Sequence, residues 1–569
     1  MTDDDAFQAV RRLLFFRLPL ISVIPVLRED SISMPSILQS RLSRLSLLSV
    51  IFGKSVTCWV GTFRRRALPA VERTLSYPQH FFSFADKMSF SENDNDYSAK
   101  GLEEYAKSLI DSNVALEPEN RASVCIAVAG GGGHAISTLA ATSGASSMLV
   151  EGTVAYDRRA FRSYVGLSYN STRVSYNSPE AARLASEMAL KRAMNFKTHN
   201  LKQMNGCVGV ACASALVSSS SPDSVKGSGY VVATRADGSQ LSINVSLAGK
   251  ADVNLRTRME EDIFISHLIL RSIELIHKSE KGIEKRDETE TKAGDTIIEE
   301  WGSSLAQDGP DDDTAFCAAQ RLLNGDEQAL VLLPVYKDGQ PVKFRALKYP
   351  VIPDGSLVMP GSFNPPHKGH ISLGQAAVRA AERMGYSSRH HELPIFMELS
   401  LTNADKPPID PQTASERIQK FLQLEDLPNQ WGLVLTRAPL FSQKLACLQD
   451  CIMERSDGTD GKISFVIGAD TLARLLNPKY YNDDKDQMID ALLSMKGAHF
   501  FAGGRVEQKK DSPGSAQFIT GMEELSGLPQ KLKEKFTIIE EQEFRVDISS
   551  TEIRQKEAER MAAAQKDHA

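Results

Sequence analysis

Three things are scarce in this chain of 569 residues: cysteine, long apolar runs and net positive charge. Its seven cysteines have no regular spacing, which argues against a secreted disulfide framework and favours a reducing compartment. The apolar stretch from Leu13 to Leu27 is short and is interrupted by Arg17, so we expect no stable membrane span. A net charge of −6 offers no basic surface to nucleic acid, which we exclude as a partner.

Length and composition divide the chain into several units. The stretch after residue 280 is acidic and contains glycine and proline, which is typical of a solvated linker. The expected division, in chain order, is an N-terminal extension (1–96), an α/β domain (97–280), an acidic linker (281–315), a connecting segment (316–350), a second α/β domain (351–556) and a tail (557–569).

The N-terminal extension has the composition of an organelle-import segment. From Met34 to Val71 it carries basic residues and serines but no acidic residue. The acidic opening, Asp3 to Asp5, does not fit a presequence, so initiation at Met34 is an alternative. We expect an intracellular protein, either mitochondrial or cytoplasmic.

The most specific motif is Gly-Ser-Phe-Asn-Pro-Pro-His-Lys-Gly-His, which runs from Gly361 to His370. It follows an apolar run, Leu357 to Met359, and precedes an apolar-periodic helix. The first turn of a helix carries unpaired N–H groups and a partial positive charge, which suit the phosphates of a nucleotide. Two histidines, His367 and His370, add side-chain donors at the same place.

Apolar runs and helical periods alternate through this second domain. Residues 395–400 and 465–470 predict two further buried strands, and helices are expected near 370–384, 413–424 and 442–455. This alternation is typical of a doubly wound parallel sheet, in which ligands bind at the carboxyl ends of the strands.

A second motif, Ile-Ser-Ser-Thr-Glu-Ile-Arg, runs from Ile548 to Arg554. Ser549 and Glu552 have capping-box spacing, so a helix is expected to begin here with hydroxyls at its positive end. On its own, this motif could simply cap a C-terminal helix.

The two motifs together resemble the nicotinamide and nicotinate mononucleotide adenylyltransferases of the cytidylyltransferase-like superfamily. The resemblance covers about residues 351 to 554 and implies a Rossmann-like α/β fold. It also implies an enzyme of NAD synthesis that joins the AMP part of ATP to a pyridine mononucleotide and releases pyrophosphate. ATP and the mononucleotide are then the small-molecule partners.

The resemblance assigns roles to individual residues. It implies that His370 donates to the α-phosphate, that His367 holds the β- and γ-phosphates, and that Arg554 grips the leaving pyrophosphate. The implied nucleotide-binding positions are Gly361, Ser362, Phe363, Asn364, Gly369, Ser549, Ser550 and Thr551. We expect Mg²⁺ to bind mainly through the ATP phosphates, because the sequence offers no carboxylate cage, and we predict no protein metal ligand.

Five further residues are candidates for binding substrate, namely Gly468, Asp470, Lys406, Arg417 and Arg505. Asp470, after the Gly468–Ala469 turn, either accepts hydrogen bonds from ribose or caps a helix. Arg417 is either a ligand or a solvated helix residue. Lys406 lies in a motif loop, and Arg505 resembles an arginine that the family carries at a strand end.

For three other side chains, packing in the core is the alternative to binding a ligand or a metal. Trp431 either stacks on a pyridine ring or is packed in the core. Cys447 and Cys451 lie one helical turn apart, and without a second ligand pair nearby, core packing is favoured over zinc.

The upstream domain resembles the C-terminal domain of the CinA family, some of whose members deamidate nicotinamide mononucleotide. The segments that carry the resemblance are 151–156 and 177–180. Ala129 stands where the family has its proposed serine nucleophile, so we expect an α/β fold without deamidase activity. Gly130 to Gly133 form either a phosphate cradle at a helix start or a plain turn. A ligand sensor, a dimerisation module and an architectural relic all remain open, and a homo-oligomer is compatible with the sequence.

Two alternatives to adenylyl transfer to a pyridine mononucleotide remain. One is cytidylyl or adenylyl transfer to another phosphate monoester, although cytidylyl relatives carry an aspartate where Asn364 stands and a different second motif. The other is a non-catalytic nucleotide-binding scaffold or sensor. The presence of His367, His370, Thr551 and Arg554 argues against the scaffold. The sequence does not distinguish nicotinamide from nicotinate mononucleotide.

Overall fold

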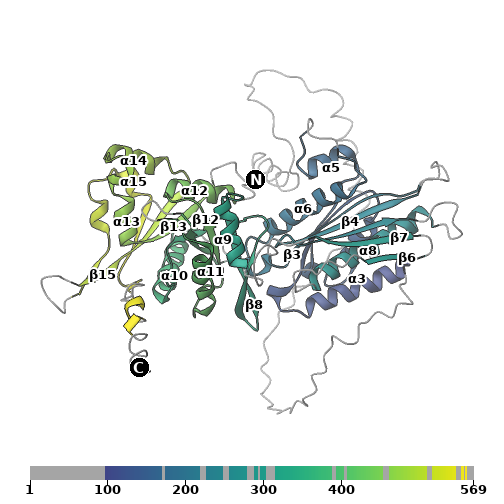
Figure 1. Cartoon of the computed structure of the whole chain (residues 1–569), viewed down its shortest axis with the longest axis horizontal. Helices are drawn as coiled ribbons and strands as arrows, with labels where there is room; N and C mark the ends of the chain where they lie inside the picture. The colour runs from purple at the N-terminus through teal and green to yellow at the C-terminus, as the bar shows by residue number, and fades with distance from the viewer. Residues whose placement is uncertain are drawn as a thin grey trace, which may run out of the picture. The chain divides into compact units, whose positions relative to one another are not determined.

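The computed structural model describes residues 97–168, 174–217, 226–247, 256–278, 288–292, 295–302, 314–386, 392–402, 407–452, 461–508, 516–545, 553–556 and 558–559. All described residues belong to one compact unit, which begins at Ser91. That unit contains two large sheets and a two-stranded arm (Figure 1). Along the described part of the chain, no helix combines the length and apolarity needed to cross a bilayer. The expected import segment lies outside the described residues.

The upstream sheet has seven strands in the order β2-β1-β3-β4-β5-β7-β6. The strand β1 is parallel to both neighbours, and the strands from β3 onward are antiparallel. The strands are β1 (Ser123–Ala129), β2 (Leu149–Val154), β3 (Cys207–Ala215), β4 (Ser228–Arg235), β5 (Gln240–Ser246), β6 (Glu288–Lys292) and β7 (Asp295–Gly302).

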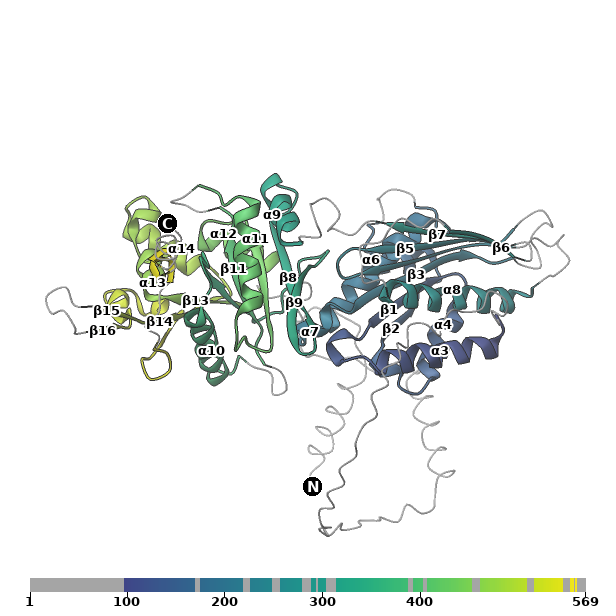
Figure 2. The same ribbon diagram turned by 60° about the horizontal axis from the view of Figure 1, so that its bottom comes forward.

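Helices cover both faces of this sheet (Figure 2). One face carries α3 (Ala99–Val114), α4 (Gly133–Ala141) and α8 (Arg258–Lys278), and the other carries α5 (Arg158–Tyr164) and α6 (Pro179–Phe196). A short helix, α7 (Leu201–Met204), leads into β3. The expected α/β fold of this half is confirmed.

The expected acidic linker is partly wrong, because β6 and β7 belong to the sheet. In β7 the acidic residues Asp295 and Glu299 are buried and lie on the same side of the strand as Ile297. Arg256 pairs with Asp295, and the Arg271 Nε lies 2.7 Å from a Glu299 carboxylate oxygen. Acidic composition suggested solvation, whereas arginines from α8 and the residues before it allow these carboxylates to be buried.

The second sheet has eight strands in the order β17-β14-β13-β10-β11-β12-β8-β9. Six of them are parallel, and β8 and β9 add an antiparallel hairpin at one edge. The strands are β8 (Ala329–Lys337), β9 (Gln340–Ala346), β10 (Leu357–Pro360), β11 (Ile395–Ser400), β12 (Trp431–Thr436), β13 (Ile463–Gly468), β14 (Ala498–Gly503) and β17 (Phe536–Ile539). The arm consists of β15 (Arg505–Gln508) and β16 (Ala516–Ile519).

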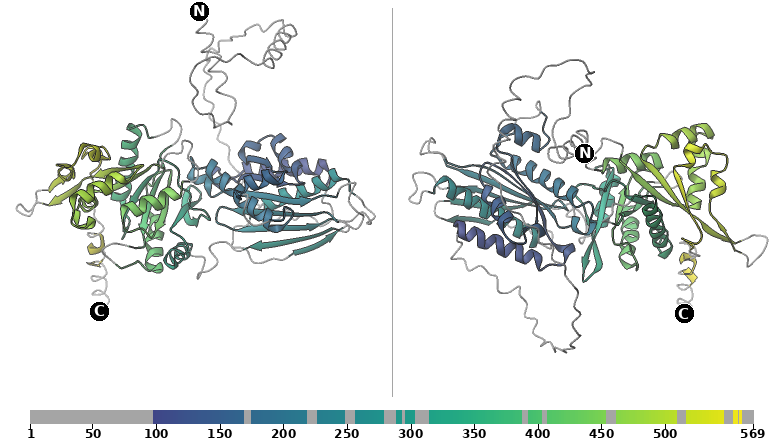
Figure 3. Two further views of the ribbon diagram at one scale, coloured as in Figure 1. Left: turned by 90° about the horizontal axis from the view of Figure 1, so that it is seen from above. Right: turned by 180° about the vertical axis from the view of Figure 1, so that it is seen from behind.

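Helices also cover both faces of the second sheet (Figures 1 and 3). One face carries α9 (Thr314–Asn324), α10 (Lys368–Arg383) and α11 (Pro411–Gln419), and the other carries α12 (Phe441–Asp450), α13 (Ala469–Leu475) and α14 (Lys485–Ser494). A further short helix is α15 (Gln530–Lys533). The expected doubly wound fold is confirmed. Its strand order reverses at β10, and such a switch point is where ligands bind in sheets of this kind.

The expected connecting segment 316–350 is also wrong, because α9, β8 and β9 are part of the second domain. Residues 329–333 are fully buried, and β8 pairs with β12, with Leu332 opposite Leu433. A run of apolar residues this short does not reveal which sheet it joins, since its partner strand lies about a hundred residues further along the chain.

The two sheets share one hydrophobic cluster. It contains Leu190 of α6 and Met204 together with Val331 and Leu333 of β8 and Leu347. Both halves belong to this one compact unit.

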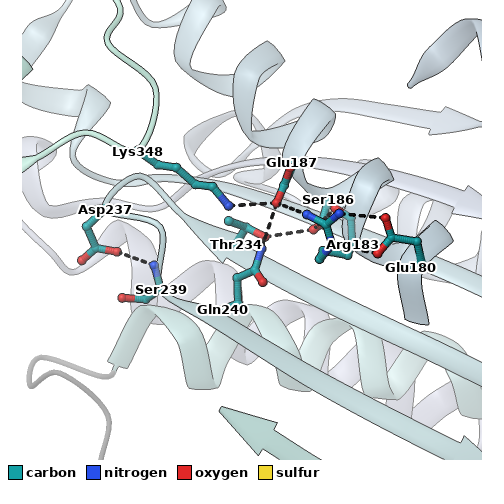
Figure 4. Close-up of polar contacts among 9 residues, drawn as sticks. All are labelled: Glu180, Arg183, Ser186, Glu187, Thr234, Asp237, Ser239, Gln240 and Lys348. Carbon is teal, nitrogen blue, oxygen red and sulfur yellow. Dashed lines mark hydrogen bonds and ion pairs between the residues drawn. The ribbon is translucent and has the colours of Figure 1, made fainter. Parts of the chain in front are cut away.

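Polar contacts join the same two halves. Lys348, which follows β9, donates from Nζ to Glu187 of α6 at 2.9 Å, and Arg183 contacts the same carboxylate oxygen at 2.7 Å. Figure 4 shows Glu187 between these two cations. Arg345 of β9 donates to the Asn205 carbonyl at 2.7 Å.

Candidate active site

The loop after β10 is folded tightly against the end of the neighbouring strand. The Gly361 N–H donates to the Glu398 carbonyl of β11 at 3.0 Å. A Cβ at Gly361 would lie 2.7 Å from the Phe363 ring, so only glycine leaves room for it. Phe363 is 1% exposed and has a φ of +40°, which is uncommon for a bulky residue. Backbone strain of this kind tends to occur at functional sites.

His367 and His370 form a reciprocal cap at the start of α10. The Nδ1 atom of His367 accepts from the Gly369 N–H at 3.1 Å, and the Nδ1 atom of His370 accepts from the His367 N–H at 3.2 Å. The ring centroids are 3.9 Å apart. Because each Nδ1 accepts a hydrogen bond, the proton of each neutral ring lies on Nε2. The two Nε2–H groups are thereby left to donate to a ligand.

Burial keeps both imidazoles neutral. It lowers the pKa of His370 to about 3, with the neighbouring His367 contributing, and it also lowers the pKa of His367. Two uncharged rings can lie this close together without repulsion, and each can still donate one hydrogen bond to a phosphate oxygen.

We predict that His370 of the free protein titrates near pH 3 rather than near the ordinary 6.5. Because folding lowers this pKa, the unfolded chain binds the proton more readily, so stability falls as the pH drops from about 6.5 towards 3. The Hε1 resonances of histidines labelled in the full chain would report the titration, with His370→Asn used for assignment. A His370 midpoint at or above 6.5 would contradict the neutral pair.

Two arginines from distant segments hold the same loop. Arg417 of α11 donates from Nη1 to the Ser362 carbonyl at 3.1 Å, and Arg554 donates to the Asn364 carbonyl. Burial lowers the pKa of Arg417, Asp410 opposes this, and the nearby charge of Arg554 lowers it further. The buried Nε of Arg417 has no hydrogen-bond partner among the described residues. Two guanidinium groups held together in this way favour an anion beside the loop.

No family model matches this chain. A curated relative does match part of it. That protein is named "Putative nicotinamide mononucleotide adenylyltransferase" and comes from Schizosaccharomyces pombe. The two are 27% identical over 134 residues, which are 23% of this chain and 46% of the relative. The match thus spans about half the length of that relative, and it confirms the resemblance to mononucleotide adenylyltransferases.

Solved structures of competence/damage-inducible proteins are also similar to part of the chain. The protein CihA from Agrobacterium tumefaciens is 19% identical, covering 31% of this chain and 93% of that one, with a TM-score of 0.24. A CinA superfamily protein from Escherichia coli is 17% identical, covering 31% of this chain and 89% of that one, with a TM-score of 0.23.

The structure also locates Gly468, Asp470 and Arg505. Gly468 is the N-cap of α13, and Asp470 lies exposed in its first turn. The alternative that Asp470 is an ordinary N-cap is therefore wrong. A Cβ on Gly468 would meet no atom within 4 Å, so there is space beside this turn. Arg505 begins β15 directly after β14, and its side chain is not described.

Several predicted residues lie outside the described residues. They are Lys406, Ser549, Ser550 and Thr551. Their roles stay predictions. Of the second motif, Arg554 is the predicted residue whose side chain the structure describes, and its contact with the Asn364 carbonyl brings the two motifs together.

Trp431 and the two cysteines are explained by packing. Trp431 is 2% exposed, and its Nε1 donates to the Tyr336 hydroxyl at 3.1 Å, so it is not placed to stack on a ligand. Cys451 points its thiol at the Cys447 carbonyl at 3.2 Å. Burial raises the pKa of the Cys447 thiol to about 11. Among the described residues, no group of three or more His, Cys, Asp or Glu could hold a metal ion.

A buried ion pair that no sequence motif predicted supports the loop. The Lys444 Nζ of α12 lies 2.8 and 2.9 Å from the two carboxylate oxygens of Glu398, and the side chains are 6% and 1% exposed. Thr436 of β12 also donates to Glu398 at 2.5 Å. The sequence does contain a signal for such a pair, namely a glutamate inside the apolar run 395–399, because a buried carboxylate needs a cationic partner. The carbonyl of this same residue fixes Gly361.

We predict that Lys444→Met destabilises the full chain strongly. Removing one partner of a buried ion pair leaves an uncompensated charge and typically costs about 3–5 kcal/mol. The measurement is the urea midpoint followed by circular dichroism. Lys368→Met is the matched control, because its pair with Glu425 is exposed and should contribute less than about 1 kcal/mol. Equal shifts for the two variants would contradict the prediction.

Proposed function

We propose that this protein is a nucleotidyltransferase that joins the AMP part of ATP to a pyridine mononucleotide in NAD synthesis. The observation that carries the proposal is the neutral pair His367 and His370 at the start of α10, with Arg417 and Arg554 bound to the same loop. The partial match to a protein named as an adenylyltransferase supports it.

The reaction needs no protein nucleophile. A phosphate oxygen of the mononucleotide attacks the α-phosphorus of Mg²⁺-ATP, forming one P–O bond, while the bond to the β-phosphate oxygen breaks and pyrophosphate leaves. Catalysis then depends on positioning the two substrates and on stabilising the charge on the phosphate oxygens.

The side chains at the loop supply donors of two kinds. The Nε2–H group of His370 donates to the α-phosphate, where charge develops, and that of His367 donates to the β- and γ-phosphates. Arg554 and Arg417 carry full positive charge and hold the departing pyrophosphate, a task suited to their several N–H groups. Mg²⁺ enters as part of the substrate, with the ATP phosphates as its main ligands.

The acceptor is proposed to bind at the ends of the neighbouring strands. Strand β13 pairs in parallel with β10, so the Gly468 turn and Asp470 lie at the same edge as the motif loop. Asp470 would accept hydrogen bonds from ribose hydroxyls, and Lys406 and Arg505 would bind the acceptor's phosphate.

The test is turnover of the purified full chain with Mg²⁺-ATP and either nicotinamide or nicotinate mononucleotide, with pyrophosphate and dinucleotide both measured. We expect dinucleotide in amounts equal to pyrophosphate. CTP would be run in parallel. Turnover with CTP but not ATP would replace the proposal with cytidylyl transfer, and nucleotide binding without any turnover would replace it with a scaffold.

A further inference from the structure

The glycine-rich loop of the upstream domain connects β1 to α4 in a sharply constrained conformation. Gly130 and Gly132 have φ values of +103° and +98°. A Cβ on Gly130 would lie 2.0 Å from the Ser214 carbonyl oxygen, and one on Gly132 would lie 2.6 Å from the Ile269 side chain of α8. The second contact shows that α8 packs directly on this loop.

An aspartate of α8 accepts hydrogen bonds from the N–H groups of the loop. One carboxylate oxygen of Asp262 accepts from the Gly132 N–H at 2.7 Å and from the Gly133 N–H at 3.3 Å. The other accepts from the His134 N–H at 3.2 Å and lies 2.6 Å from the His134 Nδ1. Three successive backbone N–H groups and an imidazole therefore surround a single carboxylate. This is the donor arrangement that holds a phosphate at the start of a helix.

The neighbouring N–H groups are satisfied internally as well. The Gly131 N–H donates to the Ser214 hydroxyl at 2.6 Å, and the Ala135 N–H donates to the Ser266 hydroxyl at 3.0 Å. From Gly131 to Ala135, every backbone N–H group thus has a side-chain acceptor, and the Asp262 side chain is 18% exposed. A phosphate would have to displace a carboxylate of like charge to reach these donors.

We propose that Asp262 is a built-in anion that occupies a phosphate-type site in the upstream domain. The loop then holds no external oxyanion, and its donors tie α4 to α8 instead. The loop is accordingly neither of the two expected alternatives, since it has the geometry of a phosphate cradle but an internal ligand. With Ala129 at the end of β1, the described loop lacks both the serine expected there by the CinA resemblance and an open anion site.

The proposal predicts that removing the carboxylate opens a site for inorganic phosphate. Hydrogen–deuterium exchange by mass spectrometry on the full chain would follow peptides covering residues 130–141. This readout is local, so phosphate bound at the proposed transferase site does not contribute to it. The wild-type loop should exchange slowly with or without phosphate. In Asp262→Ala it should exchange at least about tenfold faster, and phosphate should restore the protection.

Two further variants make the outcome decisive. Ser266→Ala removes the adjacent bond to Ala135 but leaves Asp262 in place, so it should loosen α4 without gaining any response to phosphate. Asp262→Asn keeps the shape but replaces one carboxylate oxygen with an NH2 group, which cannot accept from the loop N–H donors, and it should raise exchange even if the alanine variant does not fold.

Two results would overturn the proposal. Protection of the wild-type loop by phosphate would mean that the site is open. Equal exchange in the wild type and Asp262→Asn would mean that the carboxylate does not hold the loop.

Discussion

Replacing His370 with alanine is expected to lower kcat by about 100- to 1000-fold while weakening ATP binding far less. The reason is that the hydrogen bond from Nε2 to the α-phosphate strengthens as charge develops in the transition state, so its loss is felt mainly in turnover. Steady-state kinetics on the full chain with Mg²⁺-ATP and a pyridine mononucleotide would measure kcat, and equilibrium binding would measure the Kd for ATP.

The alanine change also removes half of the cap at the start of α10, so a structural loss must be separated from a chemical one. His370→Asn is the control, because its side-chain oxygen can replace Nδ1 as the acceptor for the His367 N–H but offers no donor at the Nε2 position. We expect this variant to unfold at nearly the wild-type temperature and to be as slow as the alanine variant. An asparagine variant with wild-type kcat would show that the histidine acts only as a cap.

Expressing residues 351–556 alone is expected to give no folded, active transferase. This fragment lacks β8, which supplies the fully buried Leu330, Leu332 and Leu333 to both faces of the second sheet. Burying one leucine contributes about 1.5–3 kcal/mol, so losing three removes about 5–9 kcal/mol. That is comparable to the whole stability of a typical domain, about 5–15 kcal/mol. The edge of β12 that pairs with β8 would also be uncovered, which invites aggregation.

A chain from residue 97 to 556 is the reference, and a fragment from residue 314 to 556 is the intermediate case. The intermediate restores α9, β8 and β9 but exposes the part of the cluster that is shared with Leu190 and Met204. We expect it to fold with lower stability than the reference. Size-exclusion chromatography, circular dichroism and pyrophosphate release would rank the three. A monomeric and active 351–556 fragment would contradict this account.

Local sequence patterns are sufficient to specify one part of the candidate site. An apolar run, a glycine and the spacing of His367 and His370 together specify a strand, a tight loop and a helix start, and the structure has these as β10 and α10. The doubly wound fold could be predicted for the same reason. The hydrophobic patterns that predict strands and helices each extend over only a few residues. Short right-handed connections between successive strands and helices then leave few other topologies.

Which charged residues contact one another depends on the tertiary fold. Arg417 and Ser362 are 55 residues apart, and Arg554 and Asn364 are 190 apart, so no local pattern indicates that these arginines hold the loop. Asp295 and Glu299 were expected to be solvated from their acidic surroundings in the sequence. They can be buried because each has an arginine partner, and those arginines lie elsewhere in the sequence. Asp262 is a further example, because it lies about 130 residues from the glycine loop in the sequence and yet accepts hydrogen bonds directly from it. Backbone preferences are local, whereas the free energy of a buried charge is set by whatever the fold places beside it.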